Sequence, residues 1–367
     1  MFEALLERDM LRASGTTGVG LAPKILVVSN MYPTSDAPAF GKFVETQVEA
    51  LRKLGCEQDV LVIQGRNRLT KYLSGIIAIR NRVRTGCYSH LHAYYGLCGF
   101  IAIFQNEVPV IVTFCGSDLN PGFAGRKRAR FRSLVIIALG QLAALRARSC
   151  IVRSREMLSR LRWHKARERT RIITSGLDLH LFSPSSRIEA RGRLGWNLQN
   201  PVVLFVCSDA ALPAVKRPEL AKAVMDEVRR ARPEAELKIV AGRPQGELPD
   251  YYNAADLLLL TSANEGSPNV VKEALACNLP VVSTRVGDVP ELLAGLKNCH
   301  VCPPDPGEIS AKVIEVLASK ERTDSRNRMS AYSLERTSVA LLEVYRDVSS
   351  RLRTQPGLTS SMEGSVR

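Results

Sequence analysis

Short apolar runs alternate with helix-like stretches along this chain, and the alternation begins twice. The first series of apolar runs occupies residues 24–30, 59–65, 108–114 and 149–154. Runs of this length, rich in Val and Ile and closed by polar residues or Gly, are typical of strands buried on both faces. Strands that alternate with helices predict a parallel sheet covered by helices on both sides.

The second series begins after a turn-rich stretch that ends near residue 183. Its apolar runs occupy residues 202–208, 236–242, 256–262 and 279–288. Two series in 367 residues predict two doubly wound α/β domains. The cleft between them should face the carboxyl ends of both sheets, where ligands bind in open α/β folds.

These patterns predict where the domains begin and end. We expect a first domain over residues 24–182 and a second over residues 183–330. The flanking parts are an N-terminal extension of residues 1–23 that lacks the apolar region of a secretory signal, a C-terminal helix over 331–352 that returns to the first domain, and a flexible tail over 353–367.

The net charge of +15 lies almost entirely in the first half of the chain. Residues 1–182 hold 27 Lys and Arg residues against 13 Asp and Glu residues, whereas residues 183–330 hold equal numbers. A nucleic-acid partner is not expected, because aromatic residues make up only 6% and no known binding motif is present. Anionic lipid headgroups, an acidic acceptor or an ordinary solvated surface would each account for the excess.

The sequence also predicts how the chain associates with membranes. No apolar run approaches the roughly 18 residues of a spanning helix, and the longest, which starts at Leu134, predicts a buried helix. Residues 66–84 mix arginines with apolar side chains, as in a helix that lies in the headgroup region; the alternative is that the apolar residues face the protein core. These apolar residues are Tyr72, Leu73, Ile76, Ile77 and Ile79.

Cysteine usage predicts the cellular compartment. The nine cysteines are an odd number with scattered spacing, which argues against a disulfide framework. We therefore expect a cytoplasmic protein, held at the inner face of the cell membrane.

The most informative stretch lies between two glutamates, Glu265 and Glu273. Glu265 ends a buried strand, so its carboxylate should emerge at the cleft, and Gly266 lets the backbone approach a ligand. Ser267 is a good helix cap, and Pro268 suits the first helical position. The free amides of that helix start form an anion site suited to a pyrophosphate. Glu273, five residues into the helix, is placed to accept hydrogen bonds from ribose hydroxyls.

In this context, Glu265 and Glu273 resemble the E-x7-E motif of the retaining family-four glycosyltransferases, which have the two-domain GT-B fold. The resemblance covers about residues 24–350. It implies that Glu265 contacts the donor sugar and Glu273 the ribose. It also implies a donor site that includes Gly266, Ser267, Pro268 and Asn269.

Lys216 follows the first strand of the second domain and resembles the family lysine that binds the donor diphosphate. A flexible ammonium group suits a leaving group that gains negative charge. Where the family usually has a Gly-Arg pair, this chain has Cys207 and Ser208. We expect Arg217 or another basic residue to take the place of the missing arginine. The alternative is that Lys216 is a surface lysine.

Two stretches of the first domain resemble family elements near the cleft. Gly41, in a loop that opens a helix, would let the backbone approach the donor phosphate, or would only start the helix. His92 lies in HLHAYYG, which resembles a His-Ala-His-Tyr-Gly stretch with Tyr94 at the second histidine. His92 is an acceptor-side candidate, with a structural histidine as the alternative.

The stretch TFCGSDLN departs from the family at one position. Cys115 stands where many members have a histidine that helps to hold the donor sugar, and a thiol cannot make the same hydrogen bonds. Gly116 and Asp118 match a variant of the family pattern. We place Cys115 and Gly116 on the acceptor side. Asp118 is assigned to acceptor positioning, with a structural turn as the alternative.

The resemblance implies glycosyl transfer from a nucleotide sugar to a glycan or lipid-linked acceptor with retention of configuration, in cell-surface polysaccharide or glycolipid synthesis. The expected catalytic residues are Glu265, Lys216 and Asp118. No cofactor or metal is expected, since Lys216 and helix amides can stabilise the leaving group. The alternatives are a degenerate sugar-nucleotide-binding subunit and a GT-B epimerase, for which we find no convincing acids and histidines in the first-domain half of the cleft.

Overall fold

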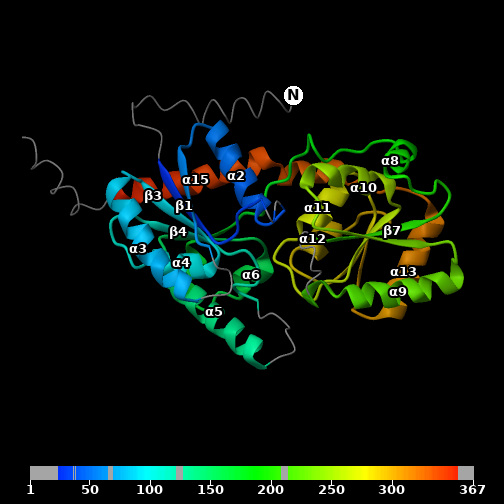
Figure 1. Cartoon of the computed structure of the whole chain (residues 1–367), viewed down its shortest axis with the longest axis horizontal. Helices are drawn as coiled ribbons and strands as arrows, with labels where there is room; N and C mark the ends of the chain where they lie inside the picture. The colour runs from blue at the N-terminus through cyan, green and yellow to red at the C-terminus, as the bar shows by residue number, and fades with distance from the viewer. Residues whose placement is uncertain are drawn as a thin grey trace, which may run out of the picture.

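Two α/β domains lie side by side along the long axis of the molecule (Figure 1). The computed structural model describes residues 24–353, except residues 36, 38, 65–68, 121–126 and 208–213. The expected N-terminal extension lies outside the described residues, as does the expected tail beyond Arg353. The expected architecture of two doubly wound α/β domains, each built on a parallel sheet, is confirmed.

The first domain is built on a parallel sheet of six strands in the order β2-β1-β3-β4-β5-β6. The strands are β1 (Ile25–Ser29), β2 (Gln58–Val62), β3 (His90–Tyr94), β4 (Val110–Thr113), β5 (Ser149–Val152) and β6 (Thr170–Ile172). Its helices are α2 (Lys42–Lys53), α3 (Leu69–Thr85), α4 (Gly96–Ala102), α5 (Lys127–Arg146), α6 (Arg155–Ser159) and α7 (His164–Glu168).

The second domain is built on a parallel sheet of five strands in the order β11-β10-β9-β7-β8. The strands are β7 (Val202–Cys207), β8 (Glu236–Ala241), β9 (Leu257–Leu260), β10 (Val281–Thr284) and β11 (His300–Cys302). Its helices are α8 (Arg187–Leu194), α9 (Pro218–Ala231), α10 (Leu248–Ala254), α11 (Asn269–Ala276), α12 (Val289–Leu293), α13 (Pro306–Ser319) and α14 (Arg326–Met329), with 3-10 turns η1 (Ala214–Lys216), η2 (Gln245–Glu247) and η3 (Ser330–Tyr332).

Strand β1 shows why the apolar runs continue without polar interruptions. All five of its residues are buried, because successive side chains point to opposite faces and both faces are covered. Leu26 and Val28 join the cluster beneath α3 and α4, whereas Ile25 and Val27 join the cluster beneath α2.

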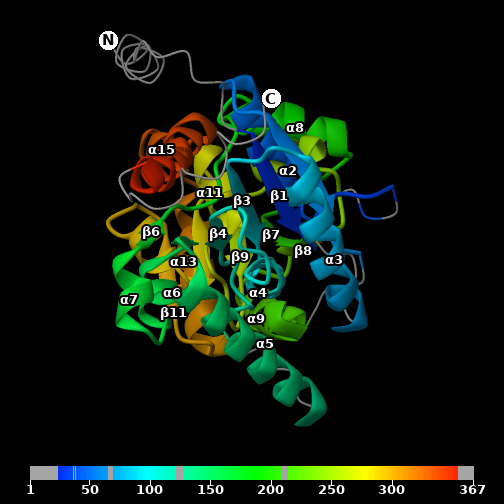
Figure 2. The same ribbon diagram turned by 90° about the vertical axis from the view of Figure 1, so that its left-hand side faces the viewer.

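The C-terminal helix α15 (Leu334–Arg353) crosses back from the second domain to the first and lies beside α2 (Figures 1 and 2). Val344 and Tyr345 on this helix pack in the same cluster as Ile25 and Val27. The two domains are therefore joined twice, at the connection after β6 and again through α15. The core of the second domain already includes Phe182, just before the boundary expected at residue 183.

The structure corrects two expectations about the first domain. Strand β3 was not predicted, because its run HLHAY contains two histidines and does not read as an apolar strand. Helix α5 was expected to be buried, yet Phe131 is 70% exposed and Leu134 is 52% exposed. Among its described side chains, the face with Gly140, Ala143 and Ala144 is the buried one, and this helix projects from the domain (Figure 2).

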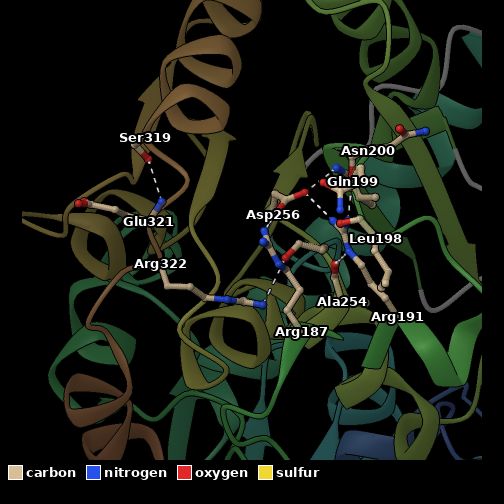
Figure 3. Close-up of polar contacts among 12 residues, drawn as sticks. Arg187, Arg191, Leu198, Gln199, Asn200, Ala254, Asp256, Ser319, Glu321 and Arg322 are labelled. Atoms are coloured by element: carbon tan, nitrogen blue, oxygen red, sulfur yellow. Dashed lines mark hydrogen bonds and ion pairs between the residues drawn. The ribbon is translucent and has the colours of Figure 1, made fainter. Parts of the chain in front are cut away.

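A polar hollow of about 140 Å³ lies at the edge of the second sheet where its strands begin, opposite the cleft. Arg191, only 2% exposed, donates to the Asp256 carboxylate at 2.8 Å and to the Ala254 carbonyl oxygen at 2.9 Å (Figure 3). Arg187 also pairs with Asp256, and Arg322 donates to backbone carbonyl oxygens. Because these guanidinium groups bind a carboxylate and backbone carbonyl oxygens of the protein itself, we interpret the cluster as structural: it holds α8 against the sheet.

Candidate active site

A cavity of about 280 Å³ opens between the two domains at the carboxyl ends of their strands. Its walls come from the loops after β1, β4 and β5 on one side, and from the loops after β7, β8 and β9 on the other. It lies where the doubly wound pattern predicted a cleft. Several predicted site residues line it, namely Gly41, Cys115, Lys216, Glu265, Ser267, Pro268, Asn269 and Glu273.

Lys216 and Glu265 meet directly in this cavity. Lys216 Nζ donates to Glu265 Oε1 at 2.5 Å, and the Ser262 hydroxyl donates to the same oxygen at 2.8 Å. Burial alone would lower the pKa of Lys216, but the Glu265 carboxylate outweighs burial and the net shift is upward. Lys216 is therefore held as an ammonium ion at the wall of the cavity, and the alternative of a surface lysine is wrong.

The start of helix α11 borders the same space. The helix begins at Asn269 with Pro268 as its N-cap, one residue later than expected, and no side chain caps it. Ser267 is therefore not the cap. The Val271 amide donates to the Pro268 carbonyl oxygen at 3.2 Å, and the amides of Asn269 and Val270 at the helix start remain available to an anion.

Glu273 lies within α11 and lines the cavity despite being buried. Its Oε2 accepts a hydrogen bond of 2.7 Å from the Tyr252 hydroxyl, and its Oε1 accepts a long one of 3.4 Å from Gln245 Nε2. Burial raises the pKa of Glu273, and the bond from Tyr252 opposes this rise. One carboxylate oxygen is thus fixed, and the other is weakly held and available to a ligand.

Two glycines, Gly116 and Gly266, lie where the two domains touch at the floor of the cavity. A Cβ on Gly116 would lie 3.5 Å from the Gly266 amide nitrogen, and one on Gly266 would lie 3.2 Å from the Cys115 carbonyl oxygen. Gly287 has φ +52°, and its Cβ would lie 2.6 Å from the Gly266 carbonyl oxygen. A side chain on Gly266 would press against the Cys115 loop of the first domain, whereas Gly287 contacts Gly266 within the second domain. Gly116 and Gly266 therefore set the approach of the two domains, and neither lines the cavity wall.

Gly41 caps the amino end of α2 in a left-handed conformation with φ +72°. A Cβ there would lie 2.4 Å from the Met31 carbonyl carbon, so only glycine fits this turn. The residue lines the cavity, and its two proposed roles, helix start and close approach to a ligand, coincide at one position.

Asp118 is fully buried and serves the turn after β4. Its carboxylate accepts hydrogen bonds from the amides of Gly96, Cys115 and Gly116 at 2.8 to 3.1 Å. Burial raises its pKa, and the amide bonds oppose this rise. The assignment of Asp118 to the catalytic residues is wrong: it shapes the loop that carries Cys115 and does not line the cavity.

His92 is also enclosed in the protein. One ring nitrogen lies 2.8 Å from the Tyr345 hydroxyl oxygen and the other 2.7 Å from Thr113 Oγ1. Burial, together with the nearby Arg153 and His90, lowers its pKa to about 3. His92 therefore ties β3 to β4 and α15, and its acceptor-side assignment is wrong.

The basic residues of the cavity differ from the expected set. Arg217 caps α9 and does not line the cavity, so it does not replace the missing arginine in this structure; Ser208 lies outside the described residues. The cavity wall instead includes Lys42, Arg153 and Arg243. Arg243 and Gln245 follow β8, which the sequence analysis predicted as the apolar run 236–242. Arg153 stands at the end of the predicted strand 149–154 but was not singled out, and Tyr252 gave no signal in the sequence.

Comparisons with known proteins agree with this arrangement. Residues 221–319 match the model of a family described as group 1 glycosyl transferases. The chain is 26% identical over 334 residues to the D-inositol 3-phosphate glycosyltransferase of Thermobispora bispora, covering 79% of this chain and 78% of that protein. It is 25% identical over 346 residues to the putative teichuronic acid biosynthesis glycosyltransferase TuaC of Bacillus subtilis, covering 73% and 82%.

Two solved structures share the fold across about nine-tenths of the chain. Sucrose-phosphate synthase from Thermosynechococcus elongatus has a TM-score of 0.75 at 19% identity, covering 90% of this chain and all of that chain. HepE of Anabaena, in complex with UDP and glucose, has a TM-score of 0.59 at 18% identity, covering 91% and 100%. The resemblance to the family-four, GT-B glycosyltransferases is confirmed.

Proposed function

We propose that this chain moves a glycosyl group from a nucleotide sugar to a glycan or lipid-linked acceptor with retention of configuration. Its residues 221–319 match the group 1 glycosyl transferases, and its fold is GT-B. The observation that carries the proposal is the Lys216–Glu265 pair, which lies in a cavity also lined by the start of α11 and by Glu273. The setting is the synthesis of a cell-surface polysaccharide or glycolipid, at the inner face of the cell membrane.

The proposed chemistry follows from where charge develops. When the bond between the anomeric carbon and the diphosphate breaks, negative charge grows on the leaving oxygen. The Lys216 ammonium and the amides of α11 would stabilise that charge without a metal. The acceptor hydroxyl would attack from the side on which the diphosphate leaves and pass its proton to the departing oxygen, so configuration is retained.

The relatives and solved neighbours support a nucleotide-sugar donor and a polyhydroxylated acceptor. HepE is described in complex with UDP-glucose, and a starch synthase of the same fold in complex with ADP. The two relatives are named for inositol 3-phosphate and for teichuronic acid synthesis. Among the described residues, no group of three His, Cys, Asp or Glu side chains could hold a metal ion, and the absence of a metal requirement stays a prediction.

A screen of UDP-, GDP- and ADP-sugars by thermal shift tests donor binding. A ligand at 100 times its dissociation constant should stabilise the folded protein by about 2.7 kcal/mol. We expect one nucleotide to raise the melting temperature, and the bare nucleoside diphosphate to retain much of the effect. Failure of all three classes to shift the transition would contradict a donor site in this cavity.

Release of nucleoside diphosphate then separates the enzyme from the two alternatives. A glycosyltransferase releases it in proportion to added acceptor and forms a glycoside. A degenerate binding subunit binds the nucleotide sugar and releases nothing. An epimerase reacts without an acceptor, and product analysis by NMR identifies an inverted sugar centre.

Peripheral binding to anionic membranes is the second part of the proposal. Leu73 and Ile77 on α3 are 66% and 64% exposed, beside the exposed Arg80 and Arg84, whereas Tyr72 and Ile79 face the core. The core-facing interpretation thus holds for Tyr72 and Ile79, and the exposure of Leu73 and Ile77 supports the proposed contact with headgroups; residues 66–68 lie outside the described residues. No helix in the described part of the chain is long and apolar enough to cross a membrane.

We expect the protein to sediment with vesicles that contain anionic lipid and to be released by salt. Each basic residue near such a surface contributes about 1 kcal/mol, and salt screens it. The variant Leu73→Ser/Ile77→Ser should bind several-fold more weakly, and Leu198→Ser, an exposed position on the second domain, should not. Equal sedimentation with anionic and neutral vesicles would contradict the proposal.

A further inference from the structure

Arg153 is a buried arginine that lines the cavity from the first domain. It follows β5, is 3% exposed and borders the cavity together with Phe43 and Cys115. Its Nη1 donates to the Ile173 carbonyl oxygen at 3.1 Å, and its Cζ lies 5.7 Å from the centre of the Phe43 ring. Its Nη2 is buried and has no hydrogen-bond partner among the described residues. The side chain is therefore fixed in place, but only part of its hydrogen-bonding capacity is used.

No carboxylate of the described residues forms an ion pair with Arg153. The neighbouring Cys115 thiol does not supply a negative charge either, because burial and Asp118 raise its pKa to about 12. Lys272, also buried, adds a second positive charge nearby; its Nζ donates to the Ser175 carbonyl oxygen at 2.8 Å. Burial lowers the pKa of Lys272 to about 8, with partial compensation from the Asp288 carboxylate. Lys272 is thus offset by nearby carboxylates, whereas Arg153 has no ion-pair partner among the described residues.

Two other buried cations of the protein have a carboxylate partner, and Lys272 has the Asp288 and Glu273 carboxylates nearby. Arg191 is paired with Asp256, and Lys216 is paired with Glu265. Burying a charge without a counter-ion costs free energy, so buried charges in proteins are normally paired. An unpaired guanidinium at the wall of a substrate cavity indicates that its counter-ion arrives with a ligand.

The position of Arg153 favours the acceptor as that ligand. The donor diphosphate already has Lys216 and the start of α11, both on the second domain. Arg153 stands across the cavity, at the carboxyl end of the first sheet and beside the loop of Cys115. A planar guanidinium group matches the two oxygens of a phosphate or carboxylate, and the Phe43 ring holds its plane in one orientation.

We propose, on the basis of the function proposed above, that Arg153 binds a phosphate or carboxylate group of the acceptor and thereby selects acidic acceptors. Arg153 is a binding residue for specificity in this scheme, and the anion it binds takes no part in the bond that breaks.

The experiment measures binding of small probes to the protein saturated with the nucleoside diphosphate found in the donor screen. Glucose 6-phosphate and glucuronate carry the two anionic groups, glucose is the matched neutral probe, and saturation-transfer NMR reports binding. We expect the wild type to bind at least one charged probe at least about tenfold more tightly than glucose, the gain expected of charge-assisted hydrogen bonds. Preference for one of the two charged probes distinguishes a phosphate from a carboxylate acceptor.

Arg153→Met should abolish this preference, and Arg153→Lys should keep part of it. Arg155→Met is the matched control, since Arg155 is exposed and does not line the cavity. Because Arg153 is buried without a counter-ion, Arg153→Met should melt at or above the wild-type temperature. A merely structural arginine would show the reverse: a lower melting temperature and an unchanged probe preference.

Three results would overturn the proposal. The first is equal or absent binding of charged and neutral probes to the wild type. The second is an unchanged preference in Arg153→Met. The third is a loss of nucleoside diphosphate affinity in Arg153→Met that matches the loss for the probes, which would assign Arg153 to the donor. Absence of any nucleotide binding by the wild type would instead refute the proposed function itself.

Discussion

Replacing Lys216 by alanine is expected to lower turnover about 10²- to 10³-fold, the usual effect of removing one group that stabilises developing negative charge. The ammonium group lies in the cavity, paired with Glu265 at 2.5 Å, and the carboxylate keeps it charged. The expected change is in the rate constant more than in the affinity for donor, since the charge on the leaving diphosphate grows in the transition state. Initial rates of nucleoside diphosphate release at saturating donor would measure it.

The partner of Lys216 gives a second test of the same pair. Glu265→Gln keeps the hydrogen bond from Ser262 but removes the charge that positions the ammonium group. If the two side chains act as one unit, the double variant should be little slower than the slower single variant. Lys222→Ala is the control, because Lys222 is an exposed lysine on α9 that pairs with Glu219. Near-normal turnover in Lys216→Ala, with unchanged folding stability, would remove this lysine from the mechanism.

Much of the fold was predictable from the chain because parallel strands buried on both faces leave a plain signal. The runs at β1, β7 and β9 are wholly apolar or nearly so, and the helices between them follow from spacing and from glycine at their ends. Strand β3 was not predicted because it contains polar histidines. They are tolerated in the interior because hydroxyl groups hydrogen-bond to them. Which polar residues find partners inside the protein depends on the tertiary structure, and sequence spacing does not contain that information.

The residues of the candidate site also fall into those that the sequence predicted and those that it did not. In the continuous segment from Glu265 to Glu273, every predicted site residue except Gly266 lines the cavity, because a strand, a turn and a helix fix their relative positions. Asp118 and His92 were misassigned, since a buried acid or histidine looks the same in sequence whether it contacts ligand or backbone. Tyr252 and Arg153 were missed because α10 and β5 bring them to the site from distant parts of the chain.

Glu273→Ala is expected to weaken binding of the donor nucleotide about 10- to 100-fold, as for a lost hydrogen bond to a charged acceptor of about 1.5–3 kcal/mol. Only Oε2 is firmly held, by Tyr252, so Oε1 is the atom a ribose hydroxyl would reach. Calorimetric titration with the nucleoside diphosphate would measure this. Because burial raises the pKa of Glu273, affinity should also begin to fall at a higher pH on acidification than it would with a surface glutamate. Glu227→Ala, on the outer face of α9, controls for general loss of charge. Unchanged affinity in Glu273→Ala would show that this carboxylate only anchors Tyr252.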